Sequence, residues 1–226
     1  MIRRTIAAAV VVVVVVWALA GASAQAPSPR DVRLVGDRFK PLTYDEMAPE
    51  QRAMLDHLLS GERGGASGPF NVLLRSPEMG DAVQQLGARV RYHSSLPSRL
   101  NEMAILLTAR EWTAQYEWYA HKRLALQAGL NPVIVDAIAA GRRPAALRDD
   151  ERALYDFQTE LLRTKTVSDA SFRAAVAAFG ERGVVDLLCN VGYYHLVSMI
   201  LNVDRYPLPA DAKPELAPIT RSPSGR

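Results

Sequence analysis

Cysteine is almost absent from the sequence, since Cys189 is the single cysteine among 226 residues. One thiol cannot form an internal disulfide, so stability has to come from packing, from assembly with other subunits, or from both. Cys189 lies in the apolar stretch VVDLLCNVGYY, which predicts a buried and unreactive thiol. Sustained alternation of apolar and polar residues is also missing, so we expect no convincing strand.

The sequence also lacks a large excess of one charge. It has 27 Lys and Arg residues against 24 Asp and Glu residues, and two of the basic residues, Arg3 and Arg4, lie in an N-terminal segment that we expect to be removed. Nucleic-acid binding requires clustered basic side chains that displace counterions from phosphates. The nearly neutral remainder argues against a nucleic-acid partner.

Residues 1–24 have the composition of a secretory signal peptide. Arg3 and Arg4 form a basic head, residues 6–20 form an apolar run that is short for a membrane span, and the small-residue sequence Ala-Ser-Ala ends at Ala24. We expect cleavage after Ala24, a periplasmic or secreted mature protein, and no stable membrane insertion afterwards. An uncleaved N-terminal anchor is the alternative.

Proline, glycine and capping residues mark the helix boundaries. The segments APEQRAMLDHLLSGER, SPEMGDAVQQLGARVRYH and NPVIVDAIAAG each have a proline in the first turn, and Ser76 and Asn131 are expected to cap the second and third. Gly141 is expected to end the third segment. Further helices are predicted over residues 168–180 and 182–203.

These segments predict an all-α fold with a single compact helical domain of seven or eight helices over residues 32–208. Residues 25–31 are expected to form a linker, and the Pro-rich residues 209–226 an extended or disordered tail. The predicted helix over residues 182–203 is apolar nearly all round, so it is expected to be central to the core or covered by another subunit.

One predicted helix carries an acid and an imidazole on its apolar side. At 100° per residue, Glu117 and His121 share a stripe with small and apolar residues, whereas the polar side is formed by Gln115, Tyr119, Lys122 and Arg123. Residues at i and i+4 contact each other, so the pair can be a simple helix hydrogen bond. It could also be half of a metal site, but no further ligands follow at matching spacing, so we expect no metal.

Glu102 is the third candidate. It lies beside the apolar stripe of the segment LPSRLNEMAILLTAREW, a position where an acid is usually solvated.

The sequence from residue 68 to 202 resembles the carboxymuconolactone decarboxylase-like family, which shares its all-helical fold with the alkylhydroperoxidase D proteins. Three segments carry the resemblance, namely GPFNVLLRSPEMGDAVQQLGARVRY, LPSRLNEMAILLTAREWTAQYEWYAHKRLALQAGL and FGERGVVDLLCNVGYYHLVSMILN. Its most specific features are Glu102, the run Tyr116-Glu117-Trp118, His121 and a helix end of the form A-x-x-A-G-L. In the peroxidase branch of that family a glutamate lies nineteen residues before a histidine, and two cysteines lie seven and four residues before it. Glu102 and His121 keep that spacing, but Ala114 and Glu117 stand at the cysteine positions, so disulfide-based peroxide reduction is not implied.

The decarboxylase branch implies cofactor-free acid/base chemistry on a small carboxylated or lactone-like molecule. His121 would carry the proton, and Glu117 or Glu102 would orient it. As substrate-binding residues we expect Tyr116 and Trp118 for the pocket wall, and Arg99 and Arg110 for the carboxylate. The family's named reaction belongs to the cytoplasm, so an exported protein is expected to act on a different substrate.

Two alternatives remain at this point. One is a peroxidase-like redox protein, and the other is a non-catalytic exported helical oligomer that binds a ligand in the same pocket. The resemblance implies a homo-oligomer, either a trimer or a hexamer of trimers.

Overall fold

A computed structural model describes residues 28–219 of the chain, in which no residue belongs to a strand. Eight α-helices and two short 3₁₀ helices form the regular structure of this part: η1 (Pro29–Asp31), η2 (Tyr44–Glu46), α1 (Pro49–Ser60), α2 (Phe70–Leu73), α3 (Pro77–Tyr92), α4 (Ser98–Trp112), α5 (Gln115–Gln127), α6 (Pro132–Ala139), α7 (Asp149–Thr164) and α8 (Asp169–Asp204). The all-α prediction is confirmed. The predicted signal peptide, residues 1–24, lies outside the described residues.

The helix boundaries follow the expected local signals. In α6, the Asn131 side chain accepts a hydrogen bond of 2.9 Å from the amide of Val133, Pro132 occupies the first turn, and Gly141 follows the helix with a φ of 66°. A positive φ favours glycine, which explains why the helix ends there. Ser76 precedes α3 as predicted, although its side chain makes no capping hydrogen bond.

Helix α8 is interrupted where the sequence predicted a break. Gly180 has φ 68° and ψ 171°, which is not helical, so residues 169–179 and 181–204 are two helical segments joined at that glycine. By length and composition α8 could cross a membrane, but the core helix of a soluble protein meets the same criterion, and half of its most apolar window is buried in the protein.

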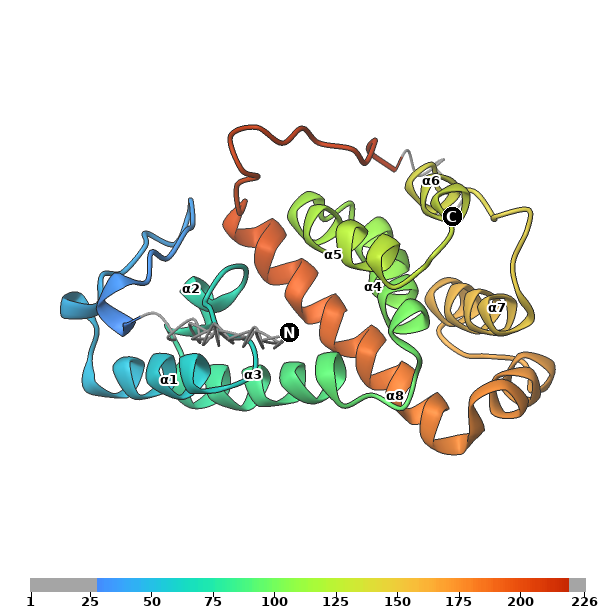
Figure 1. Cartoon of the computed structure of the whole chain (residues 1–226), viewed down its shortest axis with the longest axis horizontal. Coiled ribbons are helices and arrows are strands. Elements are labelled where there is room, and N and C mark those ends of the chain that lie inside the picture. Colours follow the sequence, from blue (N-terminus) through green and yellow to red (C-terminus); the bar gives the residue numbers. More distant parts are fainter. Residues whose placement is uncertain (1–27, 220–226) are drawn as a thin grey trace, which may run out of the picture.

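Two apolar clusters build the core, and α8 contributes to both. One cluster lies among α4, α5, α6, α7 and α8, and the other among α1, α2, α3 and the later part of α8. Figure 1 shows α8 crossing the middle of the molecule, with α1 and α3 on one side and α4 to α7 on the other. Because α4 packs against α5, α6, α7 and α8, its residues are buried over most of its length.

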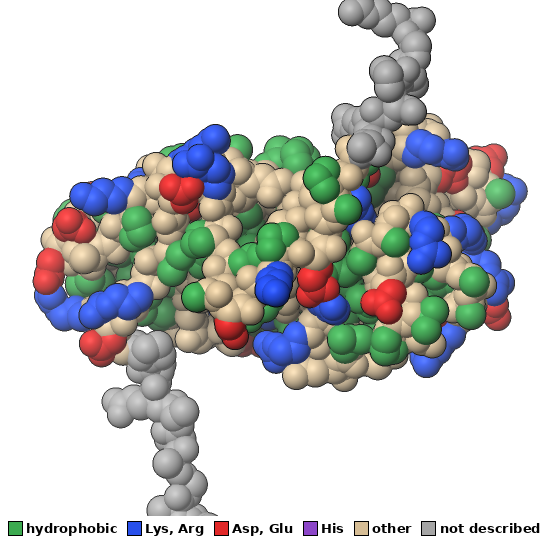
Figure 2. All heavy atoms as spheres, turned by 90° about the horizontal axis from the view of Figure 1, so that it is seen from above, with side chains coloured by type: hydrophobic (Ala, Val, Ile, Leu, Met, Phe, Trp, Pro, Cys, Tyr) green, Lys and Arg blue, Asp and Glu red, His purple; other side chains and the backbone are tan. Residues whose placement is uncertain are grey.

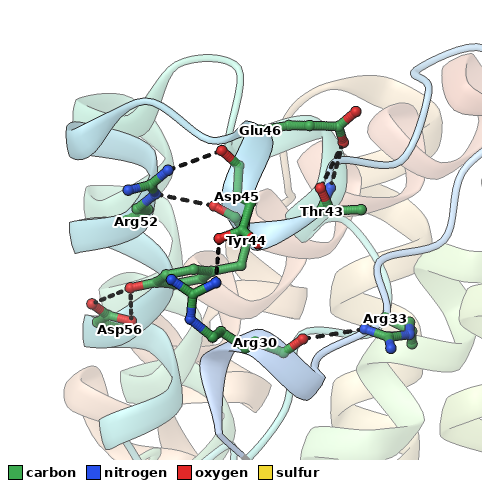
Figure 3. A network of polar contacts seen from close by, with 8 residues as sticks. All are labelled: Arg30, Arg33, Thr43, Tyr44, Asp45, Glu46, Arg52 and Asp56. Carbon is green, nitrogen blue, oxygen red and sulfur yellow. Dashed lines mark hydrogen bonds and ion pairs between the residues drawn. The ribbon is translucent and has the colours of Figure 1, made fainter.

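Polar contacts tie the N-terminal segment to α1 (Figure 3). Arg52 on α1 donates hydrogen bonds to the backbone carbonyls of Tyr44 at 3.0 Å and Asp45 at 2.9 Å. The Tyr44 hydroxyl approaches the Asp56 carboxylate at 3.3 Å, and Arg30 pairs with Asp45. These contacts hold η1 and η2 beside α1.

The chain after α8 is extended and lies against α5 on its way toward α6 (Figure 1). Gln115 at the start of α5 donates to the carbonyl of Leu216 at 2.7 Å, and the Leu216 side chain is buried in the core. The Pro-rich segment was predicted to be extended or disordered; its described part, residues 209–219, has no helix or strand, contains a turn at residues 210–211 and is docked on α5.

Helix α8 is not buried all round, and this corrects the prediction for Cys189. Its side chain is exposed. Other apolar side chains on the same helix are also exposed, namely Val185, Leu188, Met199 and Val203. Helix α8 is apolar on its exposed side as well as on its buried side, so composition alone did not reveal which residues face the core. On the face shown in Figure 2, acidic and basic side chains are interspersed among apolar ones.

Candidate active site

Three polar side chains from two adjacent helices meet in the interior. Glu102 comes from α4, and Glu117 and His121 come from α5, which packs beside α4 after a tight turn in which Thr113 has a φ of 48°. His121 Nδ1 lies 2.7 Å from Glu102 Oε2, and His121 Nε2 lies 3.1 Å from Glu117 Oε1. One imidazole therefore bridges two carboxylates through both of its nitrogens.

All three side chains are buried. The exposed fractions are 8% for Glu102, 4% for Glu117 and 5% for His121. The prediction that Glu117 and His121 lie on the buried face of their helix is confirmed. Glu102, at the edge of an apolar stripe, is buried as well because α5 covers that edge and supplies its partner.

This environment favours the protonated form of His121. Burial disfavours the charged imidazolium, but the charge of Glu117 and the hydrogen bonds that both glutamates accept outweigh burial and raise the pKa of His121 from 6.5 to about 9. At neutral pH the side chain is therefore an imidazolium that donates one hydrogen bond to each carboxylate.

The imidazole and one of the carboxylates face a cavity of about 390 Å³. Glu117 and His121 line it, whereas Glu102 lies behind them. The remaining wall is rich in arginine and tyrosine: Arg63, Arg91 and Arg123, with Tyr116, Tyr119, Tyr193 and Tyr194. Cavities of a few hundred Å³ with a few convergent polar groups are typical of small-molecule sites.

Two tyrosines of α8 line the cavity, and one of them lies next to the imidazole. The Tyr194 ring meets the His121 ring edge to face, with centroids 5.0 Å apart. Burial and the nearby Glu117 charge raise the pKa of Tyr194 well above its usual value, so its phenol remains a neutral donor. Tyr193 packs so closely on α3 that a Cβ at Gly87 would lie 2.1 Å from its hydroxyl, which explains the glycine there.

The structure brings some predicted substrate-binding residues to the cavity and leaves others elsewhere. Tyr116 lines it, and burial raises the pKa of its phenol. Trp118 does not, because its ring is fully buried in the core among α4, α5 and their neighbours.

Neither of the two predicted carboxylate-binding arginines lines this cavity. Arg99, near the start of α4, pairs with Asp150 and Glu151 at the start of α7. Arg110, near the end of α4, donates to the carbonyl of Ala217 in the docked C-terminal segment at 2.8 Å. Both side chains point from α4 toward neighbours other than α5, so their positions do not support the predicted role.

Sequence reasoning missed Arg63 and Arg91, which do line the cavity. Arg63 lies in the Gly-rich loop between α1 and α2, and Arg91 lies in the last turn of α3. The only local signal was an arginine within the run GERGGASG, which has no spacing relation to His121.

Cys189 lies in a different groove from His121. This groove is lined by residues of α3 and α8 that include Arg89, His93, Arg182 and Asp186. Among residues 28–219, no group of three His, Cys, Asp or Glu side chains has an arrangement suited to a metal ion.

Comparison with known proteins gives no family for the chain. No family model matches it, and no curated protein matches it at a significant level. What the protein does therefore has to be argued from the site itself.

Proposed function

We propose that the protein is an enzyme that transfers a proton to or from carbon in a small carboxylated molecule, with His121 and Glu117 as the acid/base pair and Glu102 as their support. The observation that carries the proposal is that Glu117 and His121 line a cavity while both nitrogens of His121 are held by carboxylates. A helix hydrogen bond between Glu117 and His121 would need neither a second carboxylate nor a cavity.

The protonation state of His121 supports proton donation as the main task. With a pKa of about 9, His121 holds a proton at neutral pH that it can give to a substrate. In a decarboxylation, the bond between the carboxylate carbon and the adjacent carbon breaks, CO₂ leaves, and the electron pair forms an enolate. The proton then moves from His121, directly or through Glu117, to the carbon that lost CO₂, and His121 is reprotonated from water.

The reaction as proposed needs no cofactor, because a carbonyl or lactone group of the substrate delocalises the electron pair. The resemblance to the carboxymuconolactone decarboxylase-like family supports this chemistry through the spacing of Glu102 and His121 and through Glu117. The chemistry is argued from the residues of the site, since fold and family do not fix a reaction.

Thiol-based peroxide reduction is the less favoured alternative. The positions where that chemistry places cysteines are occupied by Ala114 and Glu117, and Cys189 belongs to another groove. No thiol therefore lines the cavity beside His121 within the described residues.

Export and assembly complete the proposal. We infer an exported protein from the composition of residues 1–24, and a homo-oligomer from the apolar side chains that α8 leaves exposed, including Val185, Leu188 and Val203. Contiguous exposed apolar surface is typical of contacts between subunits.

The proposal is tested by incubating the full chain with a panel of β-keto acids and lactone carboxylic acids and measuring CO₂ release. In D₂O, the product should carry one deuterium on the carbon that lost CO₂. His121→Ala should lower turnover by roughly 100-fold or more, which is the usual scale for a general acid. The rate should fall as the pH rises through about 9, where His121 loses its proton.

His57→Ala is the matched control. His57 also pairs with a carboxylate, Asp81 at 2.7 Å, but it is exposed and does not line the cavity. Its removal should leave turnover unchanged. Ligand binding without turnover across the panel would instead support the non-catalytic alternative.

A further inference from the structure

Two arginines of the cavity have no acidic partner. Arg63 and Arg91 both line the cavity beside His121, and neither forms an ion pair within residues 28–219. Other arginines of the protein do pair, as Arg99 does with Glu151 and Arg143 with Asp156. The charges of Arg63 and Arg91 are therefore available to a ligand.

Two of the three guanidinium nitrogens of Arg63 are out of reach of solvent. Its Nε and Nη2 atoms are buried and have no hydrogen-bond partner, while its guanidinium lies over the buried Phe70 ring at 5.0 Å from the centroid. A buried donor without an acceptor destabilises the folded state, and more so when the donor is charged. Planar N–H groups in this state match the geometry of a carboxylate, which accepts two parallel hydrogen bonds from one guanidinium.

Tyr193 lines the same cavity as Arg63 and Arg91. Burial raises the pKa of Tyr193, while the charges of Arg63 and Arg91 oppose that rise. The Tyr193 hydroxyl therefore belongs to a part of the wall that the charges of both arginines influence. The neighbouring residue, Tyr194, contacts His121, so this position is close to the acid/base pair.

The charges of the cavity also favour an anion. An imidazolium at His121 offsets one of its two carboxylate partners, which leaves that cluster with one net negative charge. Arg63 and Arg91 add two positive charges, and the exposed Arg123 stands at the rim. One monocarboxylate brings these groups close to neutrality, which favours binding because partly buried charges are costly unless they are paired.

We infer that Arg63 and Arg91 form an anion subsite that binds the carboxylate of a small ligand beside the Tyr193 hydroxyl and so directs the ligand toward Glu117 and His121. Which end of the ligand reacts is inferred from the proposed function, whereas the negative charge of the ligand is inferred from the two arginines. A carboxylate that stays bound here is not the group lost as CO₂, so the substrate of a decarboxylation would carry a second one. Neutral amides and esters of the same shape should bind the subsite more weakly, because they cannot offset the two guanidinium charges.

Binding to the full chain tests the subsite by titration calorimetry with a matched pair of probes, 5-oxotetrahydrofuran-2-carboxylate and its carboxamide. The wild-type protein should bind the carboxylate at least tenfold more tightly than the carboxamide. Arg63→Gln and Arg91→Gln should each weaken carboxylate binding by tenfold or more without changing carboxamide binding. Arg63→Lys and Arg91→Lys keep the charge but lose the planar fork, so they should give intermediate losses.

Arg89→Gln is the control, since Arg89 is exposed on the same helix as Arg91 and lines the other groove. It should bind the carboxylate as the wild type does. The inference is overturned if the wild type binds the carboxamide as well as the carboxylate or binds neither, or if both glutamine variants bind the carboxylate normally. Because the wild-type comparison of acid and amide needs no variant, misfolding of a variant leaves the test intact.

The result is separable from the proposed function. If binding depends on Arg63 and Arg91 but no carboxylated compound is turned over, the subsite stands and the enzymatic proposal fails. If turnover is found and is unchanged in both glutamine variants, the enzyme stands and the subsite fails.

Discussion

The protonation of His121 should make the free energy of unfolding depend on pH. Its pKa is raised from 6.5 to about 9 in the folded protein, so the folded state holds the proton more tightly than the unfolded chain does. The resulting stabilisation is fully present below about pH 6.5 and is lost as the pH rises through about 9. One pKa unit corresponds to about 1.4 kcal/mol, so the contribution is about 3 kcal/mol at pH 6 and close to zero at pH 10.

Urea denaturation of the wild type and of His121→Gln at pH 6 and pH 10 measures this contribution. Lys and Tyr side chains also titrate in this range, but they do so in both proteins, so the difference between the proteins isolates His121. The stability advantage of the wild type should shrink by about 3 kcal/mol between the two pH values. His57→Gln removes an exposed histidine paired with Asp81. For this variant the stability difference from the wild type should change by less than about 1 kcal/mol between the two pH values.

An NMR titration of the histidine ring protons checks the same quantity directly. The His121 signal should titrate near pH 9, and its absence in His121→Gln assigns it. A change in the stability difference below about 1 kcal/mol, together with a His121 signal that titrates near pH 6.5, would refute the reasoning.

Four further results are expected. Cys189→Ser should leave turnover unchanged and the free energy of unfolding within about 0.5 kcal/mol of the wild-type value, because the thiol is exposed and outside the cavity. Loss of activity would instead support thiol chemistry. Gly87→Ala should lower the melting temperature and weaken ligand binding, because its Cβ would meet the Tyr193 hydroxyl at 2.1 Å; an unchanged melting temperature would contradict that packing. Leu188→Asp should dissociate the oligomer in light scattering, since it charges the exposed side of α8; a wild-type monomer at micromolar concentration would contradict assembly itself. Mass spectrometry of protein from its native source should give a chain that begins near Gln25, and a mass that includes residues 1–24 would favour the membrane anchor.

Local signals in the sequence predicted much of the fold. Pro132, Asn131 and Gly141 set the bounds of α6 through a cap, a first-turn proline and a positive φ, which depend only on neighbouring residues. The burial of Glu117 and His121 also followed from helical spacing, because their stripe was apolar and the opposite face was fully polar.

Contacts between distant segments were harder to predict. Arg63 and His121 lie 58 positions apart on a loop and a helix, and no spacing rule relates them. Cys189 was misplaced because α8 is apolar on both faces, so its pattern did not show which face packs on α3 and α4. Only the family resemblance related Glu102 to its partner His121. A separation of nineteen residues across two helices does not predict a contact unless the packing of the helices is known.

The second carboxylate favours a chemical over a purely structural interpretation of the buried pair. A buried ion pair seldom adds stability over apolar residues of similar size, so stability alone gives little reason for one imidazole to keep two buried glutamates. The proposed function gives a reason, since in it Glu102 keeps His121 oriented while Glu117 exchanges a proton at the cavity. On this view Glu102→Gln should lower turnover less than Glu117→Gln, and either combined with His121→Ala should add little further loss, because the three groups act as one unit. If the losses of turnover in the single variants multiply in the double variants, the three groups do not act as one unit.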